Sequence, residues 1–159
     1  MQHREAGRRK CGLRPEKSLA ALQPELLAKA FQLNAIGPLM VLRNFAPLLA
    51  TDPGIYAKVS TRVGSITDNH KGGLVQLPRL QNMLLQTAAI ELQRKNVLLR
   101  VVALQPGTVR SELSRPFSAG VSKRLEPAES VAGMLAALRG LQPRQGAHFI
   151  DYQGKEIPW

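Results

Sequence analysis

The apolar run VLLRVVAL at 97–104 most limits the folds that this chain can adopt. Its valines and leucines are typical of a strand buried on both faces, which occurs in parallel sheets covered by helices. Gln105-Pro106-Gly107 ends the run, and segments with apolar residues at helical spacing precede and follow it. Strands that alternate with helices predict an α/β chain with a mostly parallel sheet.

Proline and glycine mark the other expected elements. Helical spacing predicts a helix from 24 towards 49, with a kink or break at Gly37-Pro38. Pro78 fits only the first turn of a second helix, where its missing N–H would have no partner in any case. The remaining expected elements are a strand at 55–60, an end of the second helix near 95–96, a helix from 127 to 140 and a strand at 148–152.

The size and composition of the chain favour one domain. Its 159 residues, 44% of them hydrophobic, can bury one core. Residues 1–14 are charged, contain two glycines and lack periodicity, so we expect them to be unstructured and the domain to span 15–159. No apolar stretch has the length of a membrane span, and the N-terminus lacks the apolar segment of a secretory signal.

The cysteine and histidine content limits redox and metal chemistry. The single cysteine cannot form an internal disulfide, and with only three scattered histidines it offers no zinc-ligand spacing. A reducing compartment suits such a chain. We therefore expect a cytoplasmic protein that is not attached to a membrane and holds no metal.

The formal net charge of +11 raises the question of nucleic-acid binding. Part of this charge lies at 1–17, where six basic residues outnumber two acidic ones, and the rest is spread along the chain. Aromatic residues make up only 4%, which leaves few platforms for stacked bases. A solvated basic tail explains the charge better than a nucleic-acid site, and the cluster at 8–10 is equally consistent with a targeting signal.

Small polar and turn signals lie near the ends of the expected strands, where open α/β sheets bind ligands. Ser60 and Thr61 close one strand, Pro106-Gly107 follows the buried run, and Asn34 lies among apolar helix residues. Each has an ordinary structural alternative. Asn34 could be a hydrogen-bonded or capping residue, the hydroxyls could satisfy backbone groups, and Pro106-Gly107 could be only a turn.

Together these signals resemble a known family. The segments FQLNAIGPLMVLRNFAPLL, VSTRVGSITDN, VVALQPGTVRSEL and DYQGKEIPW are similar, in this order, to the C-terminal part of short-chain dehydrogenases/reductases. The C-factor-like and sniffer-like carbonyl reductases are the most similar subgroup, and the resemblance covers about 12–159. It implies a partial doubly wound Rossmann-type parallel sheet, NADP or NAD as cofactor, a small carbonyl substrate, and a homo- or hetero-oligomer.

The resemblance also implies a catalytic site of Asn, Ser, Tyr and Lys. In the family the tyrosine donates a proton to the carbonyl, the lysine lowers the tyrosine pKa and holds the cofactor ribose, and the serine polarises the carbonyl. Asn34 matches the asparagine, and Ser60 or Thr61 matches the hydroxyl position, with Thr61 favoured by register. The residues that match the cofactor-binding segment are Pro106, Gly107, Val109 and Ser111.

The chain departs from the family in two places. Subgroup members have approximately GGWYSYRASKAALNM where this chain has GGLVQLPRLQNM, so Leu77 takes the tyrosine position and Gln81 the lysine position. The first βαβ unit, with its glycine-rich phosphate loop, has no counterpart, which predicts an exposed sheet edge and weak or absent cofactor binding. We expect a truncated, impaired or inactive oxidoreductase (a pseudoenzyme). The alternative is a non-catalytic partner that oligomerises with an intact paralogue.

Residues 74–81 are consistent with a shifted reading frame. The codons CTG GTA CAG CTA CCG CGC CTC CAA encode LVQLPRLQ. Without the first base, and with the A that begins Asn82, the same bases encode WYSYRASK, the family segment. The second bases are fixed by the amino acids, whereas the third bases are chosen to fit. The hypothesis is that one base gained before Leu74 and a compensating loss before Asn82, which also removed Ala-Ala-Leu, eliminated the catalytic tyrosine and lysine.

Overall fold

Three parallel strands form the centre of the computed structural model, which describes residues 20, 22–49, 53–68, 77–112, 114 and 124–159. β1 (Ile55–Val59), β2 (Arg100–Gln105) and β3 (His148–Asp151) lie in the order β1-β2-β3. Lys58 is paired with Ala103, and Leu104 with Ile150. Parallel neighbours need long crossover connections, and a helix provides each of the two.

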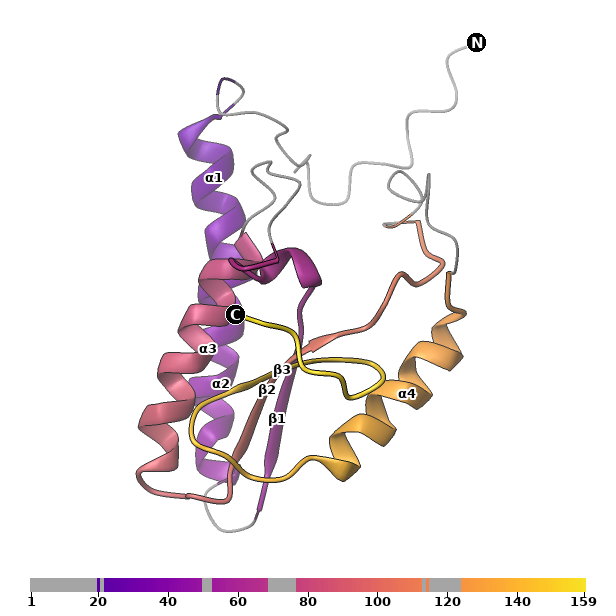
Figure 1. Ribbon diagram of the computed structural model, residues 1–159. Helices are drawn as coiled ribbons and strands as arrows, with labels where there is room; N and C mark the ends of the chain where they lie inside the picture. The colour runs from indigo at the N-terminus through magenta and orange to yellow at the C-terminus, as the bar shows by residue number, and fades with distance from the viewer. Residues whose placement is uncertain (1–19, 21, 50–52, 69–76, 113, 115–123) are drawn as a thin grey trace.

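Helices cover both faces of this sheet (Figure 1). α3 (Leu77–Gln93) connects β1 to β2 and lies beside α2 on one face, whereas α4 (Pro127–Gly140) connects β2 to β3 on the other. The remaining helical segments are α1 (Pro24–Phe31), the π-helical turn η3 (Gln32–Ile36), α2 (Gly37–Phe45), η4 (Ala46–Leu49) and η5 (Arg62–Gly64). The expected α/β class with a partial doubly wound parallel sheet is confirmed.

The side chains of the sheet alternate between two apolar layers. Val101, Ala103 and Phe149 pack towards the face that carries α2 and α3. Val102 and Leu104 pack with Ile150 towards α4. β2 is therefore buried on both faces, as its apolar run predicts.

The first helical stretch, which runs from α1 through η4 (24–49), is not broken at Gly37-Pro38. The irregular part lies just before it, in η3, where the Gly37 N–H donates to the Gln32 carbonyl five residues earlier. Pro38 has no N–H to donate to the Asn34 carbonyl, and a π-helical turn accommodates such a missing bond. Of the expected kink or break, the break is wrong, because the missing donor acts on the preceding turn and the helix continues; the expected kink is not tested.

The boundaries of the other elements differ from expectation by a few residues. α3 begins at Leu77 with Pro78 in its first turn, and α4 spans 127–140, as expected. β2 begins at Arg100 instead of 97, because the Leu99 N–H donates to the Asn96 carbonyl in a turn. The expected unstructured segment at 1–14 and most of the loop before α3, at 69–76, lie outside the described residues. Among the described helices, none is long and apolar enough to cross a membrane.

Candidate functional site

The carboxyl ends of β1 and β2 lie side by side at one end of the sheet, which is called here the carboxyl edge. The Ser60 N–H donates to the Leu104 carbonyl at 2.8 Å, so the chain leaves both strands at the same level. This brings Ser60 and Thr61 beside the turn that begins at Pro106. Since ligands of open α/β sheets bind outside the carboxyl ends of the strands, this edge is the candidate site.

Ser60 and Thr61 have different surroundings. Ser60 is 7% exposed, and its Oγ donates to Asn82 Oδ1 on α3 at 2.8 Å. Asn82 Nδ2 in turn donates to the Gly64 carbonyl at 3.3 Å. Thr61 is half-buried in extended backbone just before η5. The Ser60 hydroxyl is thus bound to α3, which leaves Thr61 as the more accessible of the two hydroxyls; their catalytic assignment stays a prediction.

Asn34 lies in the π-helical turn η3, which packs against α3. Its side chain is exposed, and Nδ2 donates to the Ala30 carbonyl at 3.0 Å. No hydrogen bond described here joins Asn34 to Ser60 or Thr61. The side chain thus has the local bond expected of the ordinary structural alternative, and its catalytic role stays a prediction.

The Pro106-Gly107 turn has a conformation that only glycine adopts easily. Gly107 has φ of 78°, and a Cβ there would lie 2.6 Å from Leu125 Cδ1 and 3.1 Å from Tyr152 Cδ1. Its N–H donates to Gln105 Oε1 at 2.9 Å. The Pro106 carbonyl accepts a hydrogen bond from Ser130 Oγ on α4 at 2.6 Å. The turn is therefore held by hydrogen bonds to Gln105 and to Ser130 of α4, and it packs against Leu125 and Tyr152.

The rest of the predicted cofactor-binding segment follows the Pro106-Gly107 turn in the chain. Val109 pairs with Leu125 in an isolated parallel bridge, and its carbonyl accepts a hydrogen bond from Ser114 Oγ at 2.5 Å. Ser111 is exposed, with its Oγ 3.2 Å from Ser114 Oγ. Pro106, Gly107, Val109 and Ser111 thus form one ordered segment after β2, although their contact with a cofactor stays a prediction.

Lys58 is a polar residue of this edge that the sequence analysis missed. Its Nζ donates to Gln81 Oε1 at 2.7 Å and to the Val59 carbonyl at 3.0 Å. Gln81 is only 4% exposed, and its Nε2 has no described partner. Burial lowers the pKa of Lys58. Alternation along β1 could have found it, because Lys58 falls on the same covered face as Tyr56.

No contact described for the two tyrosines of the chain is with the start of α3. Tyr56 Oη donates to the Pro38 carbonyl at 3.1 Å, and burial raises its pKa. Tyr152 packs beside Gly107 and Gly133, on the α4 side. Among the described residues, no group of histidine, cysteine and carboxylate side chains could hold a metal ion.

Known proteins share this architecture. A short-chain dehydrogenase/reductase from Burkholderia multivorans with bound NADP matches with a TM-score of 0.77 and 26% identity, over 92% of this chain and 61% of that one. C-signal of Myxococcus xanthus is 32% identical over 137 residues, which cover 84% of this chain and 78% of C-signal. The chain belongs to the short-chain dehydrogenase/reductase family. No family model matches the sequence.

A second curated short-chain dehydrogenase/reductase relative extends the comparison. The 1-hydroxy-2-glutathionyl-2-methyl-3-butene dehydrogenase of Rhodococcus sp. (strain AD45) is 26% identical over 144 residues. The match covers 89% of this chain but 62% of that enzyme. This chain therefore spans about three-fifths of the Rhodococcus and Burkholderia proteins and a larger share of C-signal.

Proposed function

We propose that this chain is an NADP-type carbonyl oxidoreductase whose catalysis is impaired at proton transfer. The observation that carries the proposal is the composition of the first two turns of α3, where Leu77 and Gln81 stand at the family's tyrosine and lysine positions. A leucine has no proton to donate to a carbonyl oxygen. Loss of a positioned general acid typically lowers the rate about 10²–10⁴-fold.

Gln81 cannot replace a lysine electrostatically. It is a neutral amide, and its Oε1 is already used as an acceptor by Lys58. A neutral side chain at this position would neither lower the pKa of a nearby phenol nor attract the electron-rich ribose hydroxyls as an ammonium does. Two features support the assignment as an oxidoreductase. The hydroxyls of Ser60 and Thr61 are at the position that contacts the substrate in the family, and the segment from Pro106 to Ser111 is at the position that contacts the nicotinamide.

Cofactor binding by the 159 residues is proposed to be weak. The Burkholderia short-chain dehydrogenase/reductase holds NADP, which favours NADP(H) over other cofactors for this chain. The segment from Pro106 to Ser111 would contact only the nicotinamide end, and among the described residues no glycine-rich turn leads from a strand into a helix to hold the pyrophosphate. We expect a dissociation constant for NADPH no lower than about millimolar by calorimetry; micromolar binding would contradict this part of the proposal.

A paired substitution tests the catalytic part. Leu77→Tyr with Gln81→Lys restores a tyrosine and a lysine four residues apart on α3, and Leu77→Phe with Gln81→Lys is the matched control without the phenol oxygen. At millimolar NADPH and a small aldehyde, we expect the tyrosine variant to oxidise NADPH about 10²-fold faster than the control. Equal rates in the unchanged chain and the tyrosine variant would overturn the proposal.

The coding DNA tests the origin of the change. The shifted-frame hypothesis requires GTA at Val75 and a leucine codon that ends in A (CTA or TTA) at Leu77, since only these third bases create the two tyrosine codons. A different third base at either position would contradict it. If both are present, the frame-corrected, N-terminally extended protein should reduce carbonyls with NADPH at a rate that the present chain does not reach.

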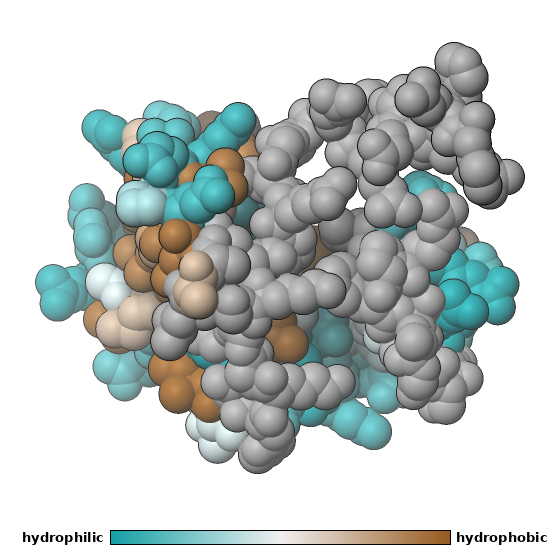
Figure 2. All heavy atoms as spheres, turned by 90° about the horizontal axis from the view of Figure 1, so that it is seen from above, coloured by the Kyte–Doolittle hydropathy of each residue, from teal (hydrophilic) through white to brown (hydrophobic). Residues whose placement is uncertain are grey.

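The second candidate function is that of a non-catalytic partner in an oligomer. Large apolar side chains are exposed along the first helical stretch and along α3, and hydrophobic residues gather on this side of the molecule in Figure 2. The most exposed on each are Leu48 at 75% and Met83 at 63%. Apolar helix faces of this kind are typical of interaction surfaces.

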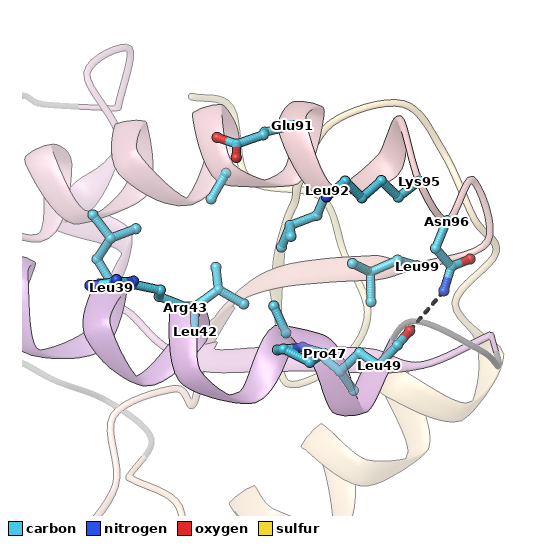
Figure 3. Close-up of a pocket in the computed structure, with 12 residues that line it drawn as sticks. Leu39, Leu42, Arg43, Pro47, Leu49, Glu91, Leu92, Lys95, Asn96 and Leu99 are labelled. Carbon is cyan, nitrogen blue, oxygen red and sulfur yellow. Dashed lines mark hydrogen bonds between the residues drawn. The ribbon is translucent and has the colours of Figure 1, made fainter.

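A groove of about 620 Å³ runs between α2 and α3 on the same side (Figure 3). Leu39, Leu42 and Leu92 contribute to its lining, and Asn96 Nδ2 closes one end by donating to the Leu49 carbonyl at 2.8 Å. Light scattering of the chain alone and with an intact paralogue tests the candidate. We expect Met83→Lys to weaken association. Lys155→Gln, in the C-terminal segment after β3, is the control that should not. A monomer under both conditions would exclude this function.

A further inference from the structure

Lys58 differs from the other described lysines in its surroundings. It is half-buried at the carboxyl end of β1, on the face that α3 covers. Its Nζ contacts two neutral oxygens, Gln81 Oε1 and the Val59 carbonyl, and no ion pair between described residues involves it. The other described lysines are exposed: Lys29, Lys95 and Lys155.

Two neutral acceptors suit an uncharged amine. A neutral amine has two N–H groups and one lone pair, so the bonds to Gln81 and Val59 would use both hydrogens and leave the lone pair free. Even partial removal of an ammonium from water is unfavourable without a carboxylate partner, and partial burial lowers the pKa of Lys58 accordingly. Since Gln81 is itself buried, α3 holds the acceptor that orients the amine.

Among the described residues, no carboxylate is paired with Lys58. Ala103, paired with Lys58 on β2, and the residues of η3 are uncharged. The charged or titratable side chains on β1, η5 and the first two turns of α3 are Tyr56, Lys58, Arg62 and Arg79. Tyr56 is bonded to the Pro38 carbonyl, and Arg62 forms ion pairs with Asp68 at 3.2 Å and Asp151 at 3.9 Å.

We propose that Lys58 is a nucleophilic amine that captures small aldehydes covalently as an imine at the carboxyl edge of the sheet. The nitrogen lone pair attacks the carbonyl carbon, and the π electrons of the carbonyl move to its oxygen. A proton then passes from nitrogen to oxygen to give a carbinolamine, which loses water and forms the C=N bond. The step consumes no oxidant or reductant and needs neither NADP(H) nor hydride transfer, so it is independent of the proposed reductase chemistry.

Reductive trapping tests this proposal on the full chain. The protein is incubated with butanal and cyanoborohydride at pH 7 without nucleotide, and the butylated lysines are quantified by peptide mapping. We expect Lys58 to be labelled severalfold faster than Lys29, Lys95 or Lys155, since a lowered pKa raises the fraction of neutral amine at pH 7. Labelling of Lys58 no faster than that of Lys29 in the folded protein would overturn the proposal.

Substitutions at Gln81 separate a positioning role from a structural one. Gln81→Glu places a carboxylate beside the amine, so the pH at which Lys58 labelling reaches half its maximum should rise. Gln81→Met keeps a neutral environment and should leave that pH unchanged while slowing the labelling. Lys29→Arg is the control that should affect neither value, and circular dichroism checks that each variant is folded. An unchanged pH profile in folded Gln81→Glu would also count against the proposal.

Discussion

The two edges of the sheet are completed in different ways. At β3 the C-terminal segment folds back along the strand, where the Ile157 N–H donates to the Phe149 carbonyl at 2.8 Å and the Asp151 N–H to the Lys155 carbonyl at 2.9 Å. The Trp159 ring also packs on Phe149, with 5.5 Å between ring centroids. Every residue of β3 is buried. This edge is covered by the chain itself.

The outer edge of β1 has no such cover among the described residues. The Gly54 carbonyl and the Ser60 N–H are bonded to the β2 side, so the alternating residues Ile55, Ala57 and Val59 present their N–H and C=O groups to the opposite edge. Val59 is 55% exposed. Whether an edge strand is covered depends on which segment of the chain returns to it, as the C-terminal segment does at β3.

The largest expected effect contrasts one side chain from each edge strand. Phe149→Ala on β3 removes a ring that is 1% exposed, which should lower the free energy of unfolding by about 3–5 kcal/mol. Val59→Ala on β1 removes apolar atoms that are largely in water and should change it by less than about 0.5 kcal/mol. Urea unfolding followed by circular dichroism measures both. Similar losses for the two variants would show that β1 is covered in solution.

Association through the open edge is the next effect in size. Ala57→Pro removes an N–H that faces away from β2, so it should block pairing with another chain without loss of a ladder bond. We expect the unchanged chain to associate or precipitate at high concentration and Ala57→Pro to shift the population to monomer in sedimentation velocity. Lys58→Pro is the matched variant, because its lost N–H faces β2 and the fold itself should weaken. If the unchanged chain were a monodisperse monomer, the outer edge of β1 would not promote association, and the two edges would not differ in this respect.

The smallest expected effect is a pH dependence of the folding stability, caused by His148 on β3, the covered edge. Burial and the charge of Arg144 lower the pKa of His148 below its ordinary value of 6.5. The unfolded chain then binds the proton more tightly than the folded one, so stability is complete above about pH 6.5 and falls as the pH drops through the lower folded pKa. Urea midpoints at pH 7.5 and 5 should differ less in His148→Gln than in the unchanged chain. An equal difference would assign the pH dependence to other groups.

The elements that could be predicted are those whose pattern is local. Pro127 at the first position and Gly140 at the end delimit α4, and the run of valines and leucines places β2 in the interior. Pro78 correctly marks the first turn of α3. The resemblance to short-chain dehydrogenases/reductases also followed from segments of contiguous residues, and the comparisons confirm the family.

Elements whose limits depend on neighbours were less predictable. The start of β2 depends on the turn hydrogen bond between Asn96 and Leu99, which apolar character does not reveal. The effect of Pro38 on the preceding turn is similar, since the helix adjusts around Asn34 instead of breaking. Both differences arise because hydrogen bonds, and not hydropathy, determine where an element begins or ends.

The sequence by itself determined the α/β class, the family, and which residues follow each strand. Only the tertiary structure decided their partners: Ser60 with Asn82 and Lys58 with Gln81, pairs that are 22 and 23 positions apart. Alternation along a strand assigns a side chain to one face of the sheet. The group that it meets there depends on how α3 docks over β1 and β2, which is set by the packing of the whole apolar layer between them.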